Sequence, residues 1–336
     1  MKPALPLFAI LLTLVFVAAR PAPAATASVV NNVQGVEIRL DLGPTEIFVG
    51  EPVYLVTKVT NRNSPLRVGN FAASFFLAEG NDLTITIQPP GELPARYMGT
   101  DEPGVYTKVE LGLDTGESET YPVTILYDAK SPNGYVFGKP GEYLVSVTLQ
   151  HSILRDVAKT QTVLPPTRIT VKAPEGRAAE AFKLLEDKPI ARALHEAVIT
   201  EPKAVAAIAR VAEEFPDTPY AAQAHYVAAA TNLNGERAEM EKAIRQFLKF
   251  LERWPGHPRA GDAIFNIALA FDRLGERETA RAWIYFLKDR VPDHRLLRVE
   301  NPLASKYYYG MLESAAKRRW WLYETPWDFT VKPEDR

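Results

Sequence analysis

The side chains that could carry out chemistry are few and lie far apart along the 336-residue chain. The five histidines are His151, His195, His225, His257 and His294. His195 and Glu196 would open the His-Glu-x-x-His motif of zinc metalloproteases, but Ile199 occupies the second histidine position. No Gly-x-Ser-x-Gly turn, Walker-type loop or dinucleotide-binding glycine pattern occurs. We therefore expect a protein that is not an enzyme and that holds no cofactor and no metal ion.

Composition excludes further classes of site. The chain has no cysteine, which rules out disulfides, thiolate catalysis and cysteine-based zinc sites. Its formal net charge is −2, whereas nucleic-acid-binding proteins usually show a strong basic excess. The acidic run at residues 114–119 lacks the spacing of a calcium-binding loop, so we expect a turn between strands there. The 46% of hydrophobic residues suffice for two ordinary domain cores.

The first residues of the chain carry the features of an export signal. Lys2 provides a positive charge, residues 5–19 form a mostly apolar run, and small residues lie before Ala24 and Ala27, after either of which the chain could be cut. The alternative is a retained membrane anchor, but spanning a bilayer needs roughly 20 apolar residues. We expect a signal peptide over residues 1–24 and an exported, periplasmic or extracellular protein with no transmembrane segment after cleavage.

The first half of the chain alternates between apolar and polar residues at period two. The clearest runs are residues 36–40, 53–56, 83–87, 106–111, 121–127, 143–149 and 168–171. Breaks rich in glycine and proline separate the runs, so each can form a short strand with one buried face. About seven such strands favour a β-sandwich, which we predict over residues 33–172.

A further signal lies between residues 42 and 61. A Gly-Glu-Pro turn at 50–52 would lead into a strand that ends in Val-Thr-Asn at 59–61. This pattern resembles the opening of immunoglobulin-like domains that are common in bacterial exported proteins. The resemblance implies an all-β immunoglobulin-like sandwich but no activity. The cysteine pair of antibody domains is absent.

Composition changes at residues 173–176, after which Ala, Glu, Arg and Leu dominate. Phe-Pro at 215–216, Trp-Pro at 254–255 and Val-Pro at 291–292 would each end a helix. The first and second pairs lie 39 residues apart, and the second and third lie 37 apart. Such a period, with two helices in each unit, indicates an all-α helical solenoid. We predict it over residues 177–324, with a capping helix at its end and a tail at 325–336.

Residues 261–292 resemble a tetratricopeptide repeat. The small residues Ala268 and Ala280 lie where that family needs them for close helix packing, and Gly275 lies in the turn. The wording of the repeats is similar to that of bacterial proteins of outer-membrane assembly and cell-division coordination.

In that family the first helices of successive repeats line a concave groove. The positions that the resemblance implies for the groove are His225, Asn232, Asp262, Phe265, Leu269, Asp272 and Arg273. The alternative for Phe265 and Leu269 is core packing against the neighbouring unit. A mixture of charged, amide and apolar groups suits a peptide or a loop of a partner protein.

Aromatic residues gather near the end of the chain. The members of this secondary aromatic patch are Tyr308, Trp320, Trp321 and Trp327. One interpretation is a capping helix, because terminal repeats need one packed and one solvated face. The other is a binding surface, because Tyr and Trp dominate interface hot spots.

These patterns favour a non-enzymatic protein–protein interaction scaffold or adaptor in the bacterial cell envelope. Its partner would be another envelope protein or peptide. The alternative is a carbohydrate- or cell-wall-binding module that uses exposed aromatics such as Tyr97, Tyr106 or Tyr135 on a glycan. A hydrolase with an unrecognised site is a third hypothesis. We expect no nucleic-acid partner.

Overall fold

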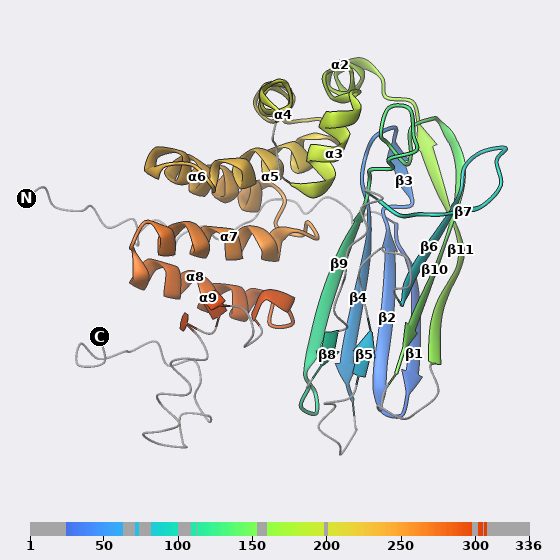
Figure 1. Cartoon of the computed structure of the whole chain (residues 1–336), viewed down its shortest axis with the longest axis horizontal. Coiled ribbons are helices and arrows are strands. Elements are labelled where there is room, and N and C mark those ends of the chain that lie inside the picture. The colour runs from blue at the N-terminus through green and yellow to red at the C-terminus, as the bar shows by residue number, and fades with distance from the viewer. Residues whose placement is uncertain are drawn as a thin grey trace, which may run out of the picture.

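A computed structural model shows sheets followed by helices (Figure 1). It describes residues 25–62, 71–73, 82–99, 109–111, 113–152, 160–197, 201–297, 302–304 and 306–307. The predicted signal peptide and the aromatic patch lie outside these residues. No helix in the described part is long and apolar enough to cross a membrane.

The strands form two large sheets and one short pair. They are β1 (Ala27–Val33), β2 (Val36–Gly43), β3 (Glu46–Phe48), β4 (Val53–Asn61), β5 (Phe71–Ala73), β6 (Leu83–Gln88), β7 (Ala95–Arg96), β8 (Val109–Leu111), β9 (Ser118–Ile125), β10 (Gly141–His151) and β11 (Thr160–Lys172). The four-stranded sheet has the order β1-β2-β4-β9, and the five-stranded sheet has the order β3-β11-β10-β6-β7. Strand β5 pairs with β8.

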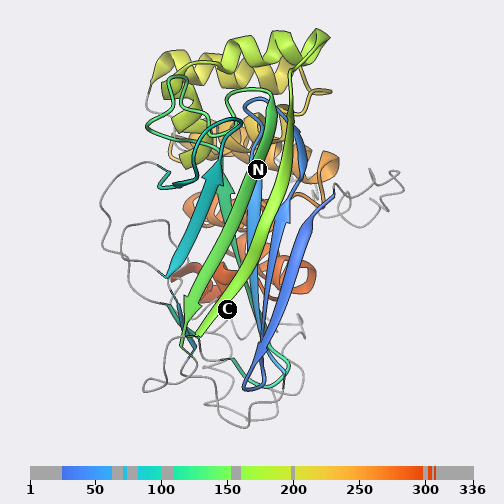
Figure 2. The same ribbon diagram turned by 90° about the vertical axis from the view of Figure 1, so that its right-hand side faces the viewer.

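The two large sheets lie face to face (Figures 1 and 2). Alternate residues of each strand point to opposite faces of a sheet, and the inward set is apolar. On β2 the inward residues include Ile38 and Leu40, and on β10 they include Val145 and Val147, all with no exposed surface. On β2, β6 and β10 the alternation seen in the sequence therefore matches the face that the strand buries.

The helices follow β11 after a short connection. They are α2 (Gly176–Leu185), α3 (Lys188–Glu196), α4 (Pro202–Glu214), α5 (Ala221–Asn232), α6 (Arg237–Arg253), α7 (Ala260–Arg273), α8 (Arg277–Arg290), the 3-10 helix η1 (Arg295–Leu297) and α9 (Pro302–Ala304). From α4 to α8 each helix packs against the next. Helices α4, α6 and α8 end in the same way, because the N–H groups of Phe215, Trp254 and Val291 each bond to the carbonyl four residues earlier. The following prolines cannot continue that ladder.

The prediction of an immunoglobulin-like sandwich followed by a tetratricopeptide solenoid is wrong. Both large sheets are open, and β3 runs parallel to β11, whereas immunoglobulin-type sheets are antiparallel. The helices do not repeat one unit, since α5 has 12 residues and α6 has 17. A solenoid repeat contacts only its neighbours. Here the helices also pack on the sheets and share one hydrophobic core with them, so tertiary contacts override the periodic pattern.

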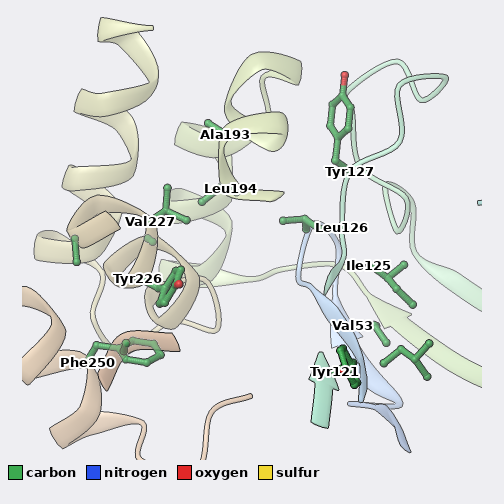
Figure 3. Packing of buried hydrophobic residues seen from close by; sticks show 14 of the residues in the cluster. Val53, Tyr121, Ile125, Leu126, Tyr127, Ala193, Leu194, Tyr226, Val227 and Phe250 are labelled. Atoms are coloured by element: carbon green, nitrogen blue, oxygen red, sulfur yellow. The ribbon is translucent and has the colours of Figure 1, made fainter. Parts of the chain in front are cut away.

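The helices attach to the outer face of β4 and β9. The outward residues of β4 are Tyr54, Val56 and Lys58, and they lie opposite Thr124, Pro122 and Thr120 of β9. The turns that follow α6 and α8 reach this face, and the turn that follows α4 contacts the loop between β3 and β4. We call these contacts the sheet–helix joint. Figure 3 shows Leu126, just after β9, pointing toward the helices.

The turns after α4 and α6 contact the strand half of the chain through polar groups. After α4, the hydroxyl of Tyr220 donates a hydrogen bond of 2.8 Å to the carbonyl of Val49. After α6, the ring of His257 lies 3.1 Å from the Tyr54 hydroxyl, measured from Nε2. The guanidinium of Arg259 donates to the hydroxyl of Thr124 at 3.1 Å.

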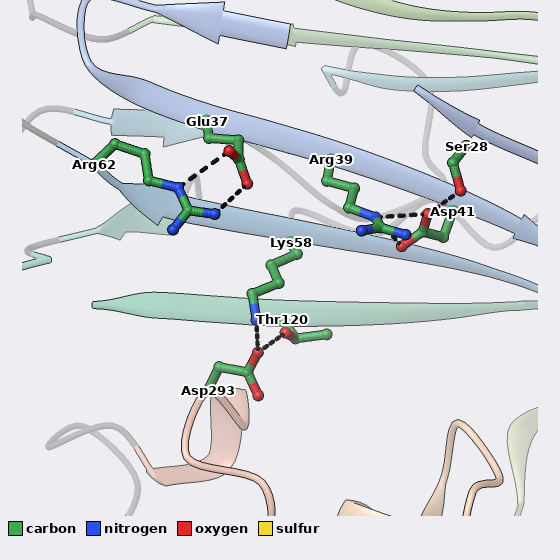
Figure 4. A network of polar contacts seen from close by, with 8 residues as sticks. All are labelled: Ser28, Glu37, Arg39, Asp41, Lys58, Arg62, Thr120 and Asp293. Carbon is green, nitrogen blue, oxygen red and sulfur yellow. Dashed lines mark hydrogen bonds and ion pairs between the residues drawn. The ribbon is translucent and has the colours of Figure 1, made fainter. Parts of the chain in front are cut away.

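The third turn, after α8, makes a charged contact with the same face (Figure 4). Its Asp293 carboxylate accepts from Lys58 at 2.7 Å and from the Thr120 hydroxyl at 2.8 Å. The backbone also pairs, because the N–H of Thr120 donates to the carbonyl of Asp293. Burial by itself would raise the pKa of Asp293, but the hydrogen bonds from Lys58 and Thr120 outweigh it and leave that pKa below its ordinary value.

The Tyr54 hydroxyl lies at the centre of a continuous network. It donates to the side-chain carbonyl of Gln223 at 3.1 Å, and the Gln223 amide donates to the carbonyl of Leu194 at 2.5 Å. The N–H of Arg259 donates to Nδ1 of His257 at 3.1 Å, so Nε2 carries the hydrogen that faces Tyr54. Burial, followed by the charge of Arg259, lowers the pKa of His257 to about 3. The ring is therefore neutral at neutral pH.

Asp293→Asn should weaken the joint. The carboxylate has only 18% of its side-chain surface exposed, and a hydrogen bond to a charged group typically contributes about 1.5–3 kcal/mol. We expect the free energy of unfolding, measured with urea, to fall by about 1–2 kcal/mol. The control is Asp289→Asn on α8, where the side chain is 78% exposed; an equal loss in both variants would contradict the role of Asp293.

The joint should also lose stability in acid. An unfolded histidine has a pKa near 6.5. The contribution of neutral His257 to the free energy of unfolding is therefore complete above about pH 6.5, and it declines as the pH falls toward 3. At pH 5 the loss is about 2 kcal/mol. His257→Gln keeps an amide donor but does not titrate, so its unfolding free energy should fall less between pH 7 and pH 5.

Urea titrations of both proteins at the two pH values test this. Burial raises the pKa of Glu51 to about 7, so this residue has the opposite pH dependence. Its contribution to the free energy of unfolding is complete below about pH 4.5 and declines as the pH rises through 7. Because both proteins contain Glu51, its effect cancels in the comparison. Equal pH dependence in the two proteins would show that His257 does not titrate as described.

Candidate functional site

The groove positions on α5 already have partners within the fold. The His225 ring lies 5.3 Å from the ring of Trp254, and burial lowers the pKa of His225. The amide of Asn232 donates to the carbonyl of Ala228 at 3.0 Å and to the side chain of Gln246 at 2.8 Å. Both residues therefore connect helices to each other.

The predicted positions in the first three turns of α7 face the sheet–helix joint or the core. The Asp262 carboxylate is buried, 3.2 Å from Nε2 of His294 and 3.4 Å from the guanidinium of Arg295. Burial would raise the pKa of Asp262, but these neighbours hold it below its ordinary value. Phe265 is 7% exposed, and Leu269 packs against the same core.

The positions at the end of α7 are also engaged. The Asp272 carboxylate pairs with Lys306 at 2.5 Å and accepts a hydrogen bond from the hydroxyl of Tyr307. The guanidinium of Arg273 donates to the carbonyl of Leu233 at 2.8 Å and to the side chain of Asn234 at 3.2 Å. The partners of these polar positions are thus residues outside the predicted set, and the contacts do not join the predicted positions to one another. Their role in binding stays a prediction.

A different concave surface lies where α2, α3 and α4 meet, at the opposite end of the row of helices from α7 and α8. It is open to solvent and has a volume of about 420 Å³. The residues that line it are Lys183, Leu184, Glu186, Asp187, Ile190, Lys203, Ala206, Ala207 and Arg210. We call it the α2–α4 hollow. Sequence reasoning missed it, although one signal was available: α4 is so rich in alanine that one of its faces has little side-chain volume.

The local sequence explains how the hollow forms. Helix α4 buries Ala204, Ile208 and Val211. Ala207 borders that face and is half-buried, whereas Ala206 lies on the opposite side of the helix and is exposed. A turn closed by the Asp187 N–H and the Leu185 carbonyl, at 2.8 Å, separates α2 from α3. The small side chains of α4 therefore face α2 and α3 without filling the space between them.

The hollow has an apolar floor and a charged rim. Lys203 pairs with Asp187 at 2.6 Å, a contact that raises the pKa of Lys203. Arg210 pairs with Glu214 at 3.1 Å. Among the described residues Lys183 has no ion-pair partner. Because these pairs are solvent-exposed they contribute little to stability, and their charges remain accessible to a ligand.

Nothing in the hollow resembles a catalytic arrangement. It contains no histidine, serine or threonine, and its two carboxylates belong to adjacent residues. Across the described residues, no group of three or more His, Asp or Glu side chains is placed to hold a metal ion. What this arrangement can do is bind an apolar group that carries charge at its edge.

The comparisons with known proteins assign no family. No family model and no curated protein matches the chain, so the predicted membership in the tetratricopeptide and immunoglobulin-like families has no support and is withdrawn. Among solved structures, the chain is similar to the sporulation control protein Spo0M from Bacillus subtilis, with 14% identity and a TM-score of 0.22. The match covers 48% of this chain and 55% of that one, and at this TM-score it supports no conclusion.

Proposed function

We propose that the chain is a non-enzymatic protein-binding scaffold of the bacterial cell envelope and that the α2–α4 hollow is its binding site. The observation that carries the proposal is the hollow itself. Its volume of about 420 Å³ falls in the usual range for a pocket that holds a side chain or small ligand. Apolar anchors in such pockets, surrounded by a polar rim, provide most of the energy of protein interfaces.

The sheet–helix joint supports the proposal, because it fixes the helices in position against the sheets. The network of Tyr54, Gln223 and Leu194 ties β4 to α5 and α3, and α3 lines the hollow. A surface that is held in one shape loses little freedom on binding. The hollow would therefore accept its partner without rearranging.

The alternative of a glycan-binding module gains nothing from the fold. Glycan binding would need Tyr97 and Tyr135 to be exposed, but each is 5% exposed or less. Tyr135 instead donates to the carbonyl of Leu185 at 2.8 Å and helps to hold α2. Tyr106 lies outside the described residues.

Ala206→Arg should weaken partner binding without unfolding the protein. Ala206 is exposed and lines the hollow, and Arg is a good helix former, so the long side chain would fill the space that a partner needs. We expect capture of a discrete protein from envelope extract to fall by at least about tenfold, a loss of about 1.4 kcal/mol. Quantitative pull-down with the tagged full chain measures this.

The matched control is Ala238→Arg, which places the same side chain at an exposed alanine on α6, away from the hollow. It should capture the partner as well as the unaltered protein does. Equal capture by the Ala206→Arg protein, or equal loss in both variants, would contradict a binding site in the hollow.

A further inference from the structure

We infer that two copies of the chain associate through the outer edge of β1, where the β1 strands of the two copies pair antiparallel about a two-fold axis at Val30. Strand β1 ends the four-stranded sheet on the side away from the helices (Figure 1). Pairing at this edge would join the four-stranded sheets of two copies into one continuous sheet. The surface lies in the strand half of the chain, so the inference does not depend on the α2–α4 hollow.

The backbone of β1 has a row of hydrogen-bonding groups that its own sheet does not use. A two-residue turn at 34–35, in which both residues have positive φ, joins β1 to β2. The residues that flank such a turn, here Val33 and Val36, form a hydrogen-bonded pair, and paired residues then alternate along the strand. The N–H and C=O groups that point away from β2 therefore belong to Ser28, Val30 and Asn32.

Among the described residues, no strand pairs with this row, because β1 pairs with β2 alone. The link from β1 to the other large sheet runs instead through an inward side chain. The amide of Asn31 donates to the hydroxyl of Thr162 at 3.1 Å. Strand β1 is thus held in position by its inner side chains, while its outer backbone groups can accept another strand.

In the described part of the chain, the other three edges of the two large sheets are short or covered. Strand β7 has two residues and β3 has three. The edge of β9 is covered, because the N–H of Thr120 donates to the carbonyl of Asp293 at 2.8 Å. Proteins protect sheet edges in these ways and also with charged residues or proline. The seven residues of β1 include neither, which favours strand addition at this edge.

The side chains of this edge complement themselves, and this property favours a second copy as the occupant. With the two-fold axis at Val30, that residue lies opposite its own copy, and Ser28 lies opposite Asn32 of the other copy. Val30 is 48% exposed, and a pair of β-branched side chains facing each other across two strands stabilises their pairing. The Ser28 hydroxyl donates to Asp41 (Figure 4), so its oxygen can still accept from the Asn32 amide.

The charges on the neighbouring strand do not oppose this pairing. Arg39 lies beside Val30 on β2 and is paired with Asp41 at 2.8 Å. Glu37 is paired with Arg62 at 2.9 Å (Figure 4). Like charges placed opposite one another cost association, but each of these charges is balanced within its own copy. An uncharged strand can therefore meet its own copy without repulsion.

Cysteine crosslinking tests the register, because the chain has no cysteine of its own. Across the two-fold axis the Cα atoms of the two Val30 residues would lie about 5.5 Å apart, within the span of a disulfide. Two Ser28 residues would lie four positions apart along the strands, or about 14 Å, which a disulfide cannot bridge. Under mild oxidation Val30→Cys should form a covalent dimer. Ser28→Cys or Asn32→Cys alone should not, whereas an equal mixture of the two should.

Sedimentation velocity of the full chain tests the association itself. An interface of one strand pair is small and therefore weak, so a dimer should form at high concentration and dissociate on dilution. Val30→Lys places two ammonium groups opposite each other and should raise the dissociation constant at least about tenfold. The matched control is Val163→Lys, at a valine that is 44% exposed on the outer face of the other sheet. It should leave the dissociation constant unchanged.

A second variant separates loss of pairing from loss of folding. Val30→Pro removes an N–H that the pairing of β1 with β2 does not use, and proline is tolerated at such a position of an edge strand. It should abolish the dimer while urea unfolding of the monomer stays close to that of the unaltered chain. A monomer at every concentration, a dimer that Val30→Lys does not weaken, or crosslinking of Ser28→Cys alone as efficient as that of Val30→Cys would each overturn the inference.

Discussion

The hydrogen bond network at the Tyr54 hydroxyl is the constraint on which the rest of the structure depends. A buried hydroxyl without partners would cost several kcal/mol, and Tyr54 is 5% exposed. Its partners come from the helical half, with Gln223 on α5 and His257 in the turn after α6. The strand can therefore bury its outer face only if the helices are docked on it, and the two halves of the chain form one body.

The placement of α2 follows from the same docking. Gly50, with φ of +77°, lies against the ring of Phe182, and a Cβ atom at this glycine would lie 2.2 Å from the ring. Tyr135 fixes the end of the helix through the carbonyl of Leu185. Because α2 is held by the sheet side and α4 by α5, the two helices leave the hollow open between them.

Docking through the turns also explains why the predicted groove residues have partners. A helix array that ended freely in solvent would expose the first turn of α7. Here that turn lies beside η1 and the joint, and Asp262 is enclosed with His294 and Arg295. Polar side chains that a repeat pattern assigns to ligand binding are used instead to satisfy one another, as buried charges must be.

Much of the local structure could be predicted from the sequence, because it depends on neighbouring residues. Alternation at positions such as Ile38 and Leu40 determined the strands and their buried faces, and the Pro-containing breaks after Phe215, Trp254 and Val291 determined where helices end. The sheet–helix joint and the hollow were decided only by tertiary structure. Tyr54 and His257 are 203 residues apart, and no local period reveals which turn will meet which strand. The hollow, likewise, is a gap between three helices, and its shape depends on how the sheets hold them.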